Sequence, residues 1–262
     1  MFNHCSVGIF MPWRVFALTT LMLMVSPVWS ATTLVAVAAD FTKPMTEIAA
    51  EFHKATGHEA KLSFGSSGKA FAQIQSSAPF EVYLSASEKY PVELEKAGLV
   101  VPGSRFVYAI GKLVLWSATP GYVDEKGEVL KTGNFKHIAL ADPTHAPYGV
   151  VAEAVMSSLG VLDKLRPLFV MGENISQTFQ FVTTGNAELG FVALAQVIDL
   201  QTGKIGNGSG WLIPDELHGP FNQTAVLLQT GAENPAALAL VDFLKSPTAR
   251  AVIKKYGFGL PE

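Results

Sequence analysis

The chain has 262 residues, of which 49% are hydrophobic, with 19 basic and 22 acidic side chains and a formal net charge of −3. This length suits one large or two small domains, and the composition can bury a good core. No basic cluster is present that could follow a phosphate backbone, so we do not expect nucleic acid as a partner.

The first 30 residues have the pattern of a cleaved signal peptide. Arg14 precedes the apolar run 15–25, and Pro27 and small residues lead to a cleavage site after Ser30. The run is shorter than the ~18 residues expected of a membrane helix, although a one-pass anchor stays the alternative. Cleavage leaves 18 basic and 22 acidic residues, a net charge of −4, and removes the one cysteine. We therefore predict export to a Gram-negative periplasm, without a disulfide or thiol chemistry.

The first part of the mature chain alternates short apolar runs with amphipathic segments. Strands are predicted at 33–39, 59–64 and 80–86, with helices at 42–56, after Ser67 and at 87–97. Such alternation indicates a parallel sheet with right-handed crossovers.

A longer predicted strand, 106–118 with a central Gly111, leads into a second α/β series and could cross between two lobes. Further strands are expected at 137–141, 168–171, 188–194 and 224–228, with helices at 148–159 and 175–184. The sequence of the tail, 235–256, indicates two helices that are separated at Ser246-Pro247. The pattern favours an α/β fold with two lobes, 31–112 plus 224–262 and 113–223.

Small and polar residues follow several strands at the point where a helix opens. These places are Ala39-Asp40, Gly65-Ser66-Ser67, Pro147-Tyr148-Gly149 and Asn174-Ile175. In open α/β sheets, ligands bind beyond the carboxyl ends of the strands. Helix N-termini that point into one cleft could hold an anion there without lysine or arginine.

The turn at Ser66 and Ser67 has competing interpretations. Ser66-x-x-Lys69 with Lys131-Thr132-Gly133 resembles penicillin-recognising serine enzymes, with Ser66 as nucleophile and Lys69 as base. The S-D-N element of that family is missing, and its K-T-G lies nearer the C-terminus. A phosphate-binding loop is excluded because Ser63 stands where it needs glycine. A plain helix cap stays open beside anion binding.

Metal binding has little support in the sequence. The histidines of the mature chain form no i,i+4 pair with a supporting carboxylate. We therefore predict no resident metal ion and no cofactor.

Several segments in order resemble the periplasmic molybdate-binding proteins of ABC importers. They are 34–52, LSFGSSGKAFAQI at 62–74, 78–86, LADPTHAPYG at 140–149, 189–194 and 243–258. The resemblance implies a two-lobed periplasmic-binding-protein-like fold, each lobe a mostly parallel sheet flanked by helices, joined by crossing strands. It implies a monomer without enzymatic activity that delivers molybdate, and tungstate of nearly the same size, to an inner-membrane ABC permease. Phosphate, sulfate or another oxyanion is the alternative ligand.

The resemblance also implies the ligand-binding residues. They are Ser67, Tyr148 as a hydroxyl donor, Ile175 through its backbone N–H, and Asp40 where the family commonly has Ser or Asn, with Ala39 and Ser66 beside them. Asp40 would repel a dianion in a dry cleft. Its side chain could turn away to cap the helix near Thr42, bind as the neutral acid, or accept a proton from the ligand. The first interpretation is preferred.

Overall fold

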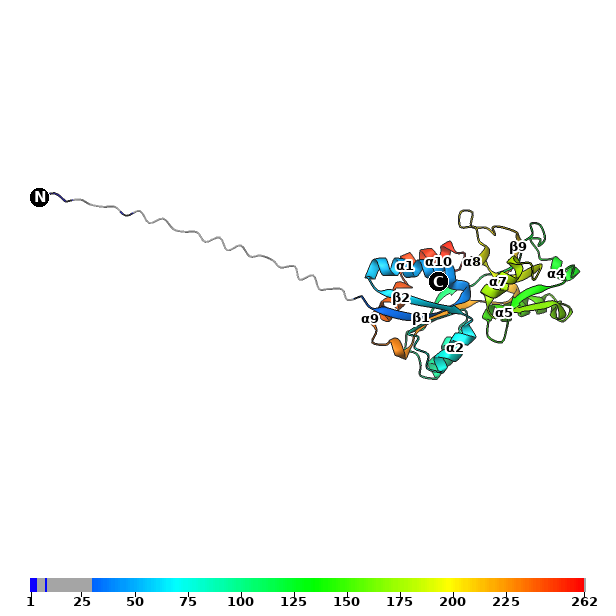
Figure 1. The fold of residues 1–262 in the computed structure, drawn as a ribbon, viewed down its shortest axis with the longest axis horizontal. Helices are drawn as coiled ribbons and strands as arrows, with labels where there is room; N and C mark the ends of the chain where they lie inside the picture. The colour runs from blue at the N-terminus through cyan, green and yellow to red at the C-terminus, as the bar shows by residue number, and fades with distance from the viewer. Residues whose placement is uncertain (4–7, 9–29, 262) are drawn as a thin grey trace.

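The computed structural model describes residues 1–3, 8 and 30–261. Two five-stranded sheets, each flanked by helices, form two lobes that lie side by side (Figure 1). The predicted signal peptide, residues 1–30, falls almost entirely outside the described part of the chain. Among the helices described, none combines the length and hydropathy needed to cross a membrane.

The first lobe contains the sheet with strand order β2-β1-β3-β10-β4. Its strands are β1 (Thr32–Ala38), β2 (Glu59–Gly65), β3 (Val82–Ser85), β4 (Phe106–Ile110) and β10 (Asn222–Leu227). Its helices are α1 (Thr42–Thr56), α2 (Ser67–Gln75), α3 (Lys89–Lys96), α9 (Pro235–Phe243) and α10 (Pro247–Lys255). β1 pairs in parallel with β2 and β3, whereas β10 is antiparallel to β3 and β4. Blue and red segments share this lobe in Figure 1, so both ends of the folded chain belong to it.

The second lobe repeats this arrangement with the strand order β7-β6-β8-β5-β9. Its strands are β5 (Leu113–Ser117), β6 (Ile138–Ala141), β7 (Phe169–Gly172), β8 (Leu189–Ala193) and β9 (Ser209–Leu212). Its helices are α4 (Val129–Thr132), α5 (Pro147–Ser158), α6 (Leu162–Leu165), α7 (Ile175–Thr183) and α8 (Leu194–Val197). β6 pairs in parallel with β7 and β8, and β5 is antiparallel to β8 and β9. Single 3-10 turns are η1 (Ala39–Phe41), η2 (Arg166–Leu168), η3 (Asp215–Leu217) and η4 (Gln229–Gly231).

The predicted fold class, two α/β lobes, is confirmed. One predicted element is wrong: 106–118 is not a single long strand but β4 and β5, which belong to different sheets. The chain crosses between them at Gly111, whose N–H donates to the carbonyl of Phe221 at 2.9 Å. A Cβ at Gly111 would lie 2.8 Å from the Phe221 ring, so the crossing segments can approach only because this residue is glycine. The lobe bounds 31–112 plus 224–262 and 113–223 stay a prediction.

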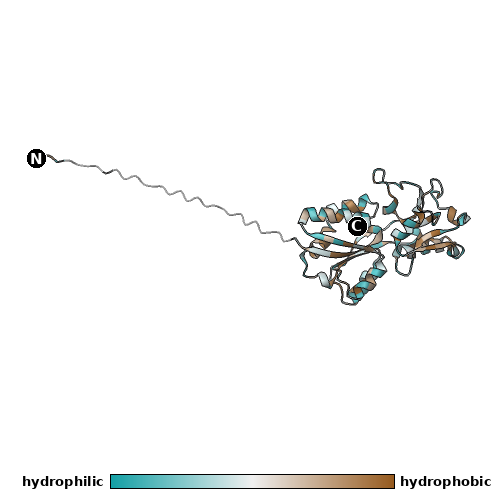
Figure 2. Ribbon diagram, viewed as in Figure 1, coloured by the Kyte–Doolittle hydropathy of each residue, from teal (hydrophilic) through white to brown (hydrophobic). Residues whose placement is uncertain are grey.

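The helices form where hydrophobic residues recur at helical spacing. In α1, Met45, Ile48 and Phe52 are fully buried on one face against the first sheet. The helix ends at Gly57, which takes the left-handed conformation with φ 75°. Figure 2 shows hydrophilic and hydrophobic residues alternating along the ribbons of such helices, as expected where one face is buried.

Candidate functional site

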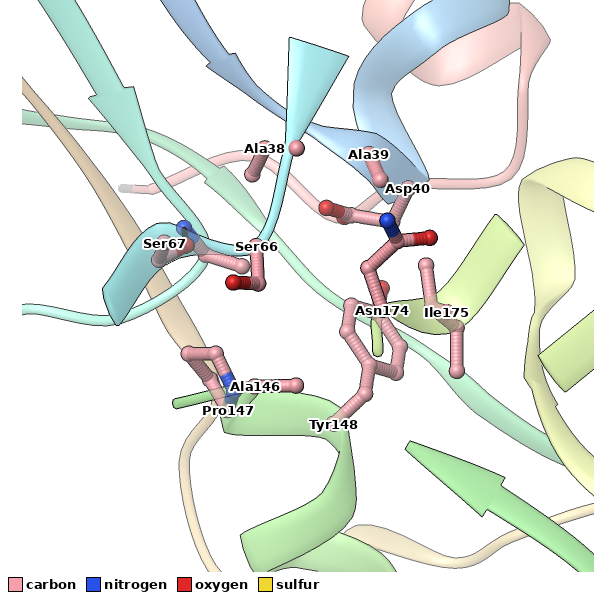
Figure 3. Close-up of a pocket in the computed structure, with 12 residues that line it drawn as sticks. Ala38, Ala39, Asp40, Ser66, Ser67, Ala146, Pro147, Tyr148, Asn174 and Ile175 are labelled. Carbon is pink, nitrogen blue, oxygen red and sulfur yellow. Dashed lines mark hydrogen bonds between the residues drawn. The ribbon is translucent and has the colours of Figure 1, made fainter. Parts of the chain in front are cut away.

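A small cavity lies between the lobes, at the ends of strands from the first sheet and at the openings of three helices (Figure 3). Its lining is Ala38, Ala39, Asp40, Gly65, Ser66, Ser67, Ala86, Ala146, Pro147, Tyr148, Asn174 and Ile175. All six residues predicted for the site, Ala39, Asp40, Ser66, Ser67, Tyr148 and Ile175, are therefore brought together. The lining contains one carboxyl group and no basic side chain.

The serine turn supplies both a helix cap and a buried hydroxyl. Ser66 is the N-cap of α2, and its Oγ accepts from the N–H of Lys69 at 3.4 Å. Ser67 is 1% exposed, and its Oγ accepts from the N–H of Ala86 at 2.9 Å. Because that oxygen already has a donor, the hydroxyl proton of Ser67 can be donated into the cavity.

The opening of α5 positions Tyr148. Pro147 stands in the first turn, where its missing N–H has no cost. Gly149 passes so close to β6 that a Cβ would lie 2.0 Å from the carbonyl oxygen of Ala141. This close packing holds the Tyr148 side chain in the interface, where its ring meets Phe221 edge-on with centroids 4.6 Å apart. The Pro-Tyr-Gly sequence thus fixes a buried hydroxyl at the cavity.

The opening of α7 leaves a backbone donor at the cavity. Asn174 is the N-cap, and its Oδ1 accepts from the N–H groups of Ser176 and Gln177 at 2.9 and 3.1 Å. The first N–H groups of a helix have no partner inside it. The N–H of Ile175, the first residue of α7, therefore stays available for a ligand, as does that of Ser67 in α2. Both lie at helix ends of partial positive charge.

Asp40 is the one carboxyl group in the cavity, and it is 3% exposed. Its Oδ2 accepts a short hydrogen bond from Nε2 of Gln223. Burial raises the pKa of this carboxyl to about 6, although hydrogen bonds from Gln223 and Tyr148 partly oppose the shift. The preferred interpretation of Asp40 as a cap is wrong, because α1 begins at Thr42 without a side-chain cap.

Sequence reasoning missed the residues that hold Asp40. Gln223 is fully buried in β10, and its Oε1 accepts from the hydroxyl of Tyr108 in β4 at 2.7 Å. Its Nε2 also lies 3.4 Å from the hydroxyl oxygen of Tyr148. Gln223 follows Asp40 by 183 residues, so no local pattern relates them. The one available signal was a polar residue directly before the predicted buried strand 224–228.

The lobes touch each other around the cavity. The N–H of Gly68 donates to the carbonyl oxygen of His145 at 2.8 Å, and Nζ of Lys69 lies 3.0 Å from Oε1 of Glu173. Ser176 Oγ also donates to the carbonyl oxygen of Ala39 at 3.3 Å. Each contact joins one lobe to the other, so the structure is a closed form.

The arrangement required of an acyl-enzyme is not formed. The ammonium of Lys69 pairs with Glu173, and Ser66 Oγ accepts from the backbone of Lys69. Lys131 lies in α4 of the second lobe and pairs with Glu128 at 2.9 Å. It does not line the cavity, so the S-x-x-K and K-T-G matches are separate local features.

Comparison with known proteins shows the family of the chain. Residues 33–259 match the model of the bacterial extracellular solute-binding protein family. The chain belongs to this family. Within it, the chain is 55% identical over 226 residues to the molybdate-binding protein ModA of Azotobacter vinelandii, covering 86% of this chain and 89% of that one. It is 51% identical over 242 residues to ModA of Rhodobacter capsulatus, covering 92% and 94%.

Solved structures of solute-binding proteins show the same fold. The periplasmic molybdate-binding protein of Azotobacter vinelandii superposes with a TM-score of 0.85 at 43% identity, over 88% of this chain and 100% of that chain. The sulfate-binding protein SubI of Mycobacterium tuberculosis has a TM-score of 0.66 at 15% identity, over 88% and 86%, and shares the fold alone. The predicted solute-binding function is confirmed over the acyl-enzyme alternative.

Proposed function

We propose that this protein binds molybdate, and tungstate of nearly the same size, in the cavity between its lobes. The observation that carries the proposal is the convergence of uncharged donors from both lobes on one closed cavity. The hydroxyls of Ser67 and Tyr148 and the N–H groups of Ser67 and Ile175 replace the hydration shell of the anion. Two relatives more than half identical over most of the chain are named molybdate-binding proteins.

Neutral donors suit an anion that has to be released again. Helix N-termini and hydroxyls stabilise negative charge without forming an ion pair. Such donors select a ligand by the size of the cavity and by the number of acceptor oxygens that the ligand offers. The lobes close on the anion by bending at the crossing segments near Gly111 and Phe221.

The transport role follows from the family. We propose that the signal peptide directs the chain to the periplasm, where it works as a monomer without catalysis. The partner is an inner-membrane ABC permease that receives the anion from the closed form. No resident cofactor takes part, since the oxyanion is the cargo.

Isothermal titration calorimetry against molybdate, tungstate, sulfate and phosphate tests the proposal. We expect molybdate and tungstate to bind with similar affinity, and sulfate and phosphate at least 100-fold more weakly. Tighter binding of phosphate or sulfate than of molybdate would reject molybdate as the ligand. Failure of every oxyanion to bind would reject the site itself.

A further inference from the structure

Asp40 places a carboxyl group in a cavity that otherwise presents hydrogen-bond donors. It lines the cavity beside Ser67 and Tyr148 and is shielded from solvent. An ionised carboxylate has acceptors only, so it offers nothing to an oxyanion and repels it. A ligand that carries two negative charges increases this conflict, because water is excluded from the closed cleft.

Among the described residues, no basic side chain contacts Asp40 to offset its charge. The nearest lysine of α1, Lys43, has its ammonium 3.3 Å from the carbonyl oxygen of Gln196. The lysine of α2, Lys69, pairs with Glu173 across the cleft. The conflict between Asp40 and an anion is therefore not relieved by a counter-ion of the protein.

The titratable groups that face Asp40 are two tyrosines. Tyr148 approaches from α5, and Tyr108 of β4 approaches through Gln223. The helices α7 and α8, which pack on η1, contain no ionisable residue. The first carboxyl group of α1 is that of Glu47, and it pairs with Lys255. Burial raises the pKa of both tyrosines, so their hydroxyls stay protonated in the physiological range.

Gln223 occupies one of the two oxygens of the Asp40 carboxyl group. Its Oε1 accepts from Tyr108, and this sets the amide so that Nε2 points to Oδ2 of Asp40. The hydroxyl of Tyr148 and the backbone N–H groups of Asp40 and Phe41 also hydrogen-bond to this carboxyl group, whose other oxygen is Oδ1. A proton there turns Asp40 into one more O–H donor, in keeping with the hydroxyls of Ser67 and Tyr148 around the cavity.

We propose that Asp40 enters the ligand complex as the neutral acid, so that capture of a doubly charged oxyanion takes up one proton from solvent. This inference rests on the proposed oxyanion site and adds a proton to its reaction. Free protein with ionised Asp40 and a molybdate dianion take one proton from water, which bonds to Oδ1 of Asp40. Because the pKa of Asp40 is about 6 without ligand, protonation of this carboxyl near neutral pH has only a modest cost in free energy.

Calorimetry of the full mature chain with sodium molybdate at pH 7.5 tests the inference. Titrations in buffers of different ionisation enthalpy give the number of protons taken up, even where binding is too tight for a direct Kd. We expect about one proton for wild type and none for Asp40→Asn, whose amide mimics the neutral acid. Above pH 6, the wild-type affinity should fall about tenfold per pH unit, and that of D40N should stay constant.

Asp142→Asn is the matched control, because Asp142 lies in the cleft loop of the second lobe but outside the cavity lining. We expect D142N to keep the proton uptake of wild type. Tight molybdate binding with no proton uptake and the same affinity from pH 5.5 to 8.5 would overturn the inference while leaving the proposed function intact. Wild-type binding of hydrogen phosphate without proton uptake, lost in D40N, would also overturn it, because Asp40 would then accept the ligand's own proton.

Discussion

Gly68 and His145 meet across the cleft, with the N–H of Gly68 donating to the carbonyl oxygen of His145 at 2.8 Å. A Cβ at Gly68 would lie 2.6 Å from the Cβ of His145 and 2.7 Å from its Cα. These atoms belong to opposite lobes, so the closed form tolerates only hydrogen at this position. Gly68 has a helical backbone conformation, which other residues also adopt. A glycine is therefore needed here for closure of the lobes and not for its backbone freedom.

Gly68→Ala is expected to weaken ligand binding without destabilising the free protein. Alanine clashes with His145 only when the lobes close, and in α2 it is favoured over glycine by about 1 kcal/mol. We expect at least a tenfold loss of molybdate affinity by calorimetry and an unchanged or higher Tm without ligand. Gln75→Ala, at the exposed end of the same helix, controls for helix propensity. Unchanged affinity of G68A would show that binding does not need this closed form.

The ion pair between Lys69 and Glu173 should stabilise the closed form only slightly. The two atoms are 3.0 Å apart, but both side chains are about half exposed, at 49% and 48%. Exposed pairs contribute about 0.2–1 kcal/mol and are screened by salt. We expect Glu173→Gln to raise the dissociation rate of molybdate less than fivefold in stopped-flow fluorescence, and this effect to vanish at 1 M NaCl. Lys131→Gln in α4, outside the interface, is the control. An effect that persists at high salt would contradict an electrostatic role.

Ser67→Ala should reduce both stability and affinity. The substitution leaves the buried N–H of Ala86 without its acceptor, which costs about 1–3 kcal/mol of unfolding free energy. It also removes a hydroxyl donor from the cavity, so we expect a further loss of affinity of tenfold or more. Urea denaturation and calorimetry measure the two effects separately.

Ser66→Ala provides the comparison for Ser67. It removes a long cap bond of 3.4 Å to Lys69, worth about 1 kcal/mol. A loss of affinity in S66A as large as that in S67A would contradict the assignment of Ser67 as the hydroxyl donor.

Asp40 should make the free protein less stable as the pH rises. Its pKa is raised from 3.8 to about 6 in the folded state, so folding favours the protonated form. The stabilisation is fully present below pH 4 and is lost as the pH rises through 6. At pH 8, Asp40→Asn should therefore increase the free energy of unfolding relative to wild type, by up to about 3 kcal/mol.

Urea denaturation of wild type and D40N at pH 4 and pH 8 measures this difference without ligand. The gain from D40N should be larger at pH 8, because the asparagine has no charge to desolvate. Asp142→Asn should show the opposite trend, since hydrogen bonds from Thr144 hold the pKa of Asp142 below its usual value. A gain from D40N that does not change with pH would mean that Asp40 is not ionised in the free protein at pH 8.

The alternation of strands and helices was readable from the sequence because it depends on local periodicity. Segment 42–56 is α1 to the residue, and the predicted break at Ser246-Pro247 separates α9 from α10. The cleft loops were also readable, because caps and small residues mark helix openings. For this reason all six predicted residues lie around one cavity.

Long-range pairing was decided only by the tertiary structure. The apolar run 106–118 looks continuous, yet the sheets divide it at Gly111, because each half finds hydrogen-bond partners in a different lobe. The state of Asp40 likewise depends on Gln223 and Tyr108, which the sheet order brings beside it from distant strands. Local sequence sets which residues open a helix, whereas burial and charge at the site arise from contacts between segments far apart in the chain.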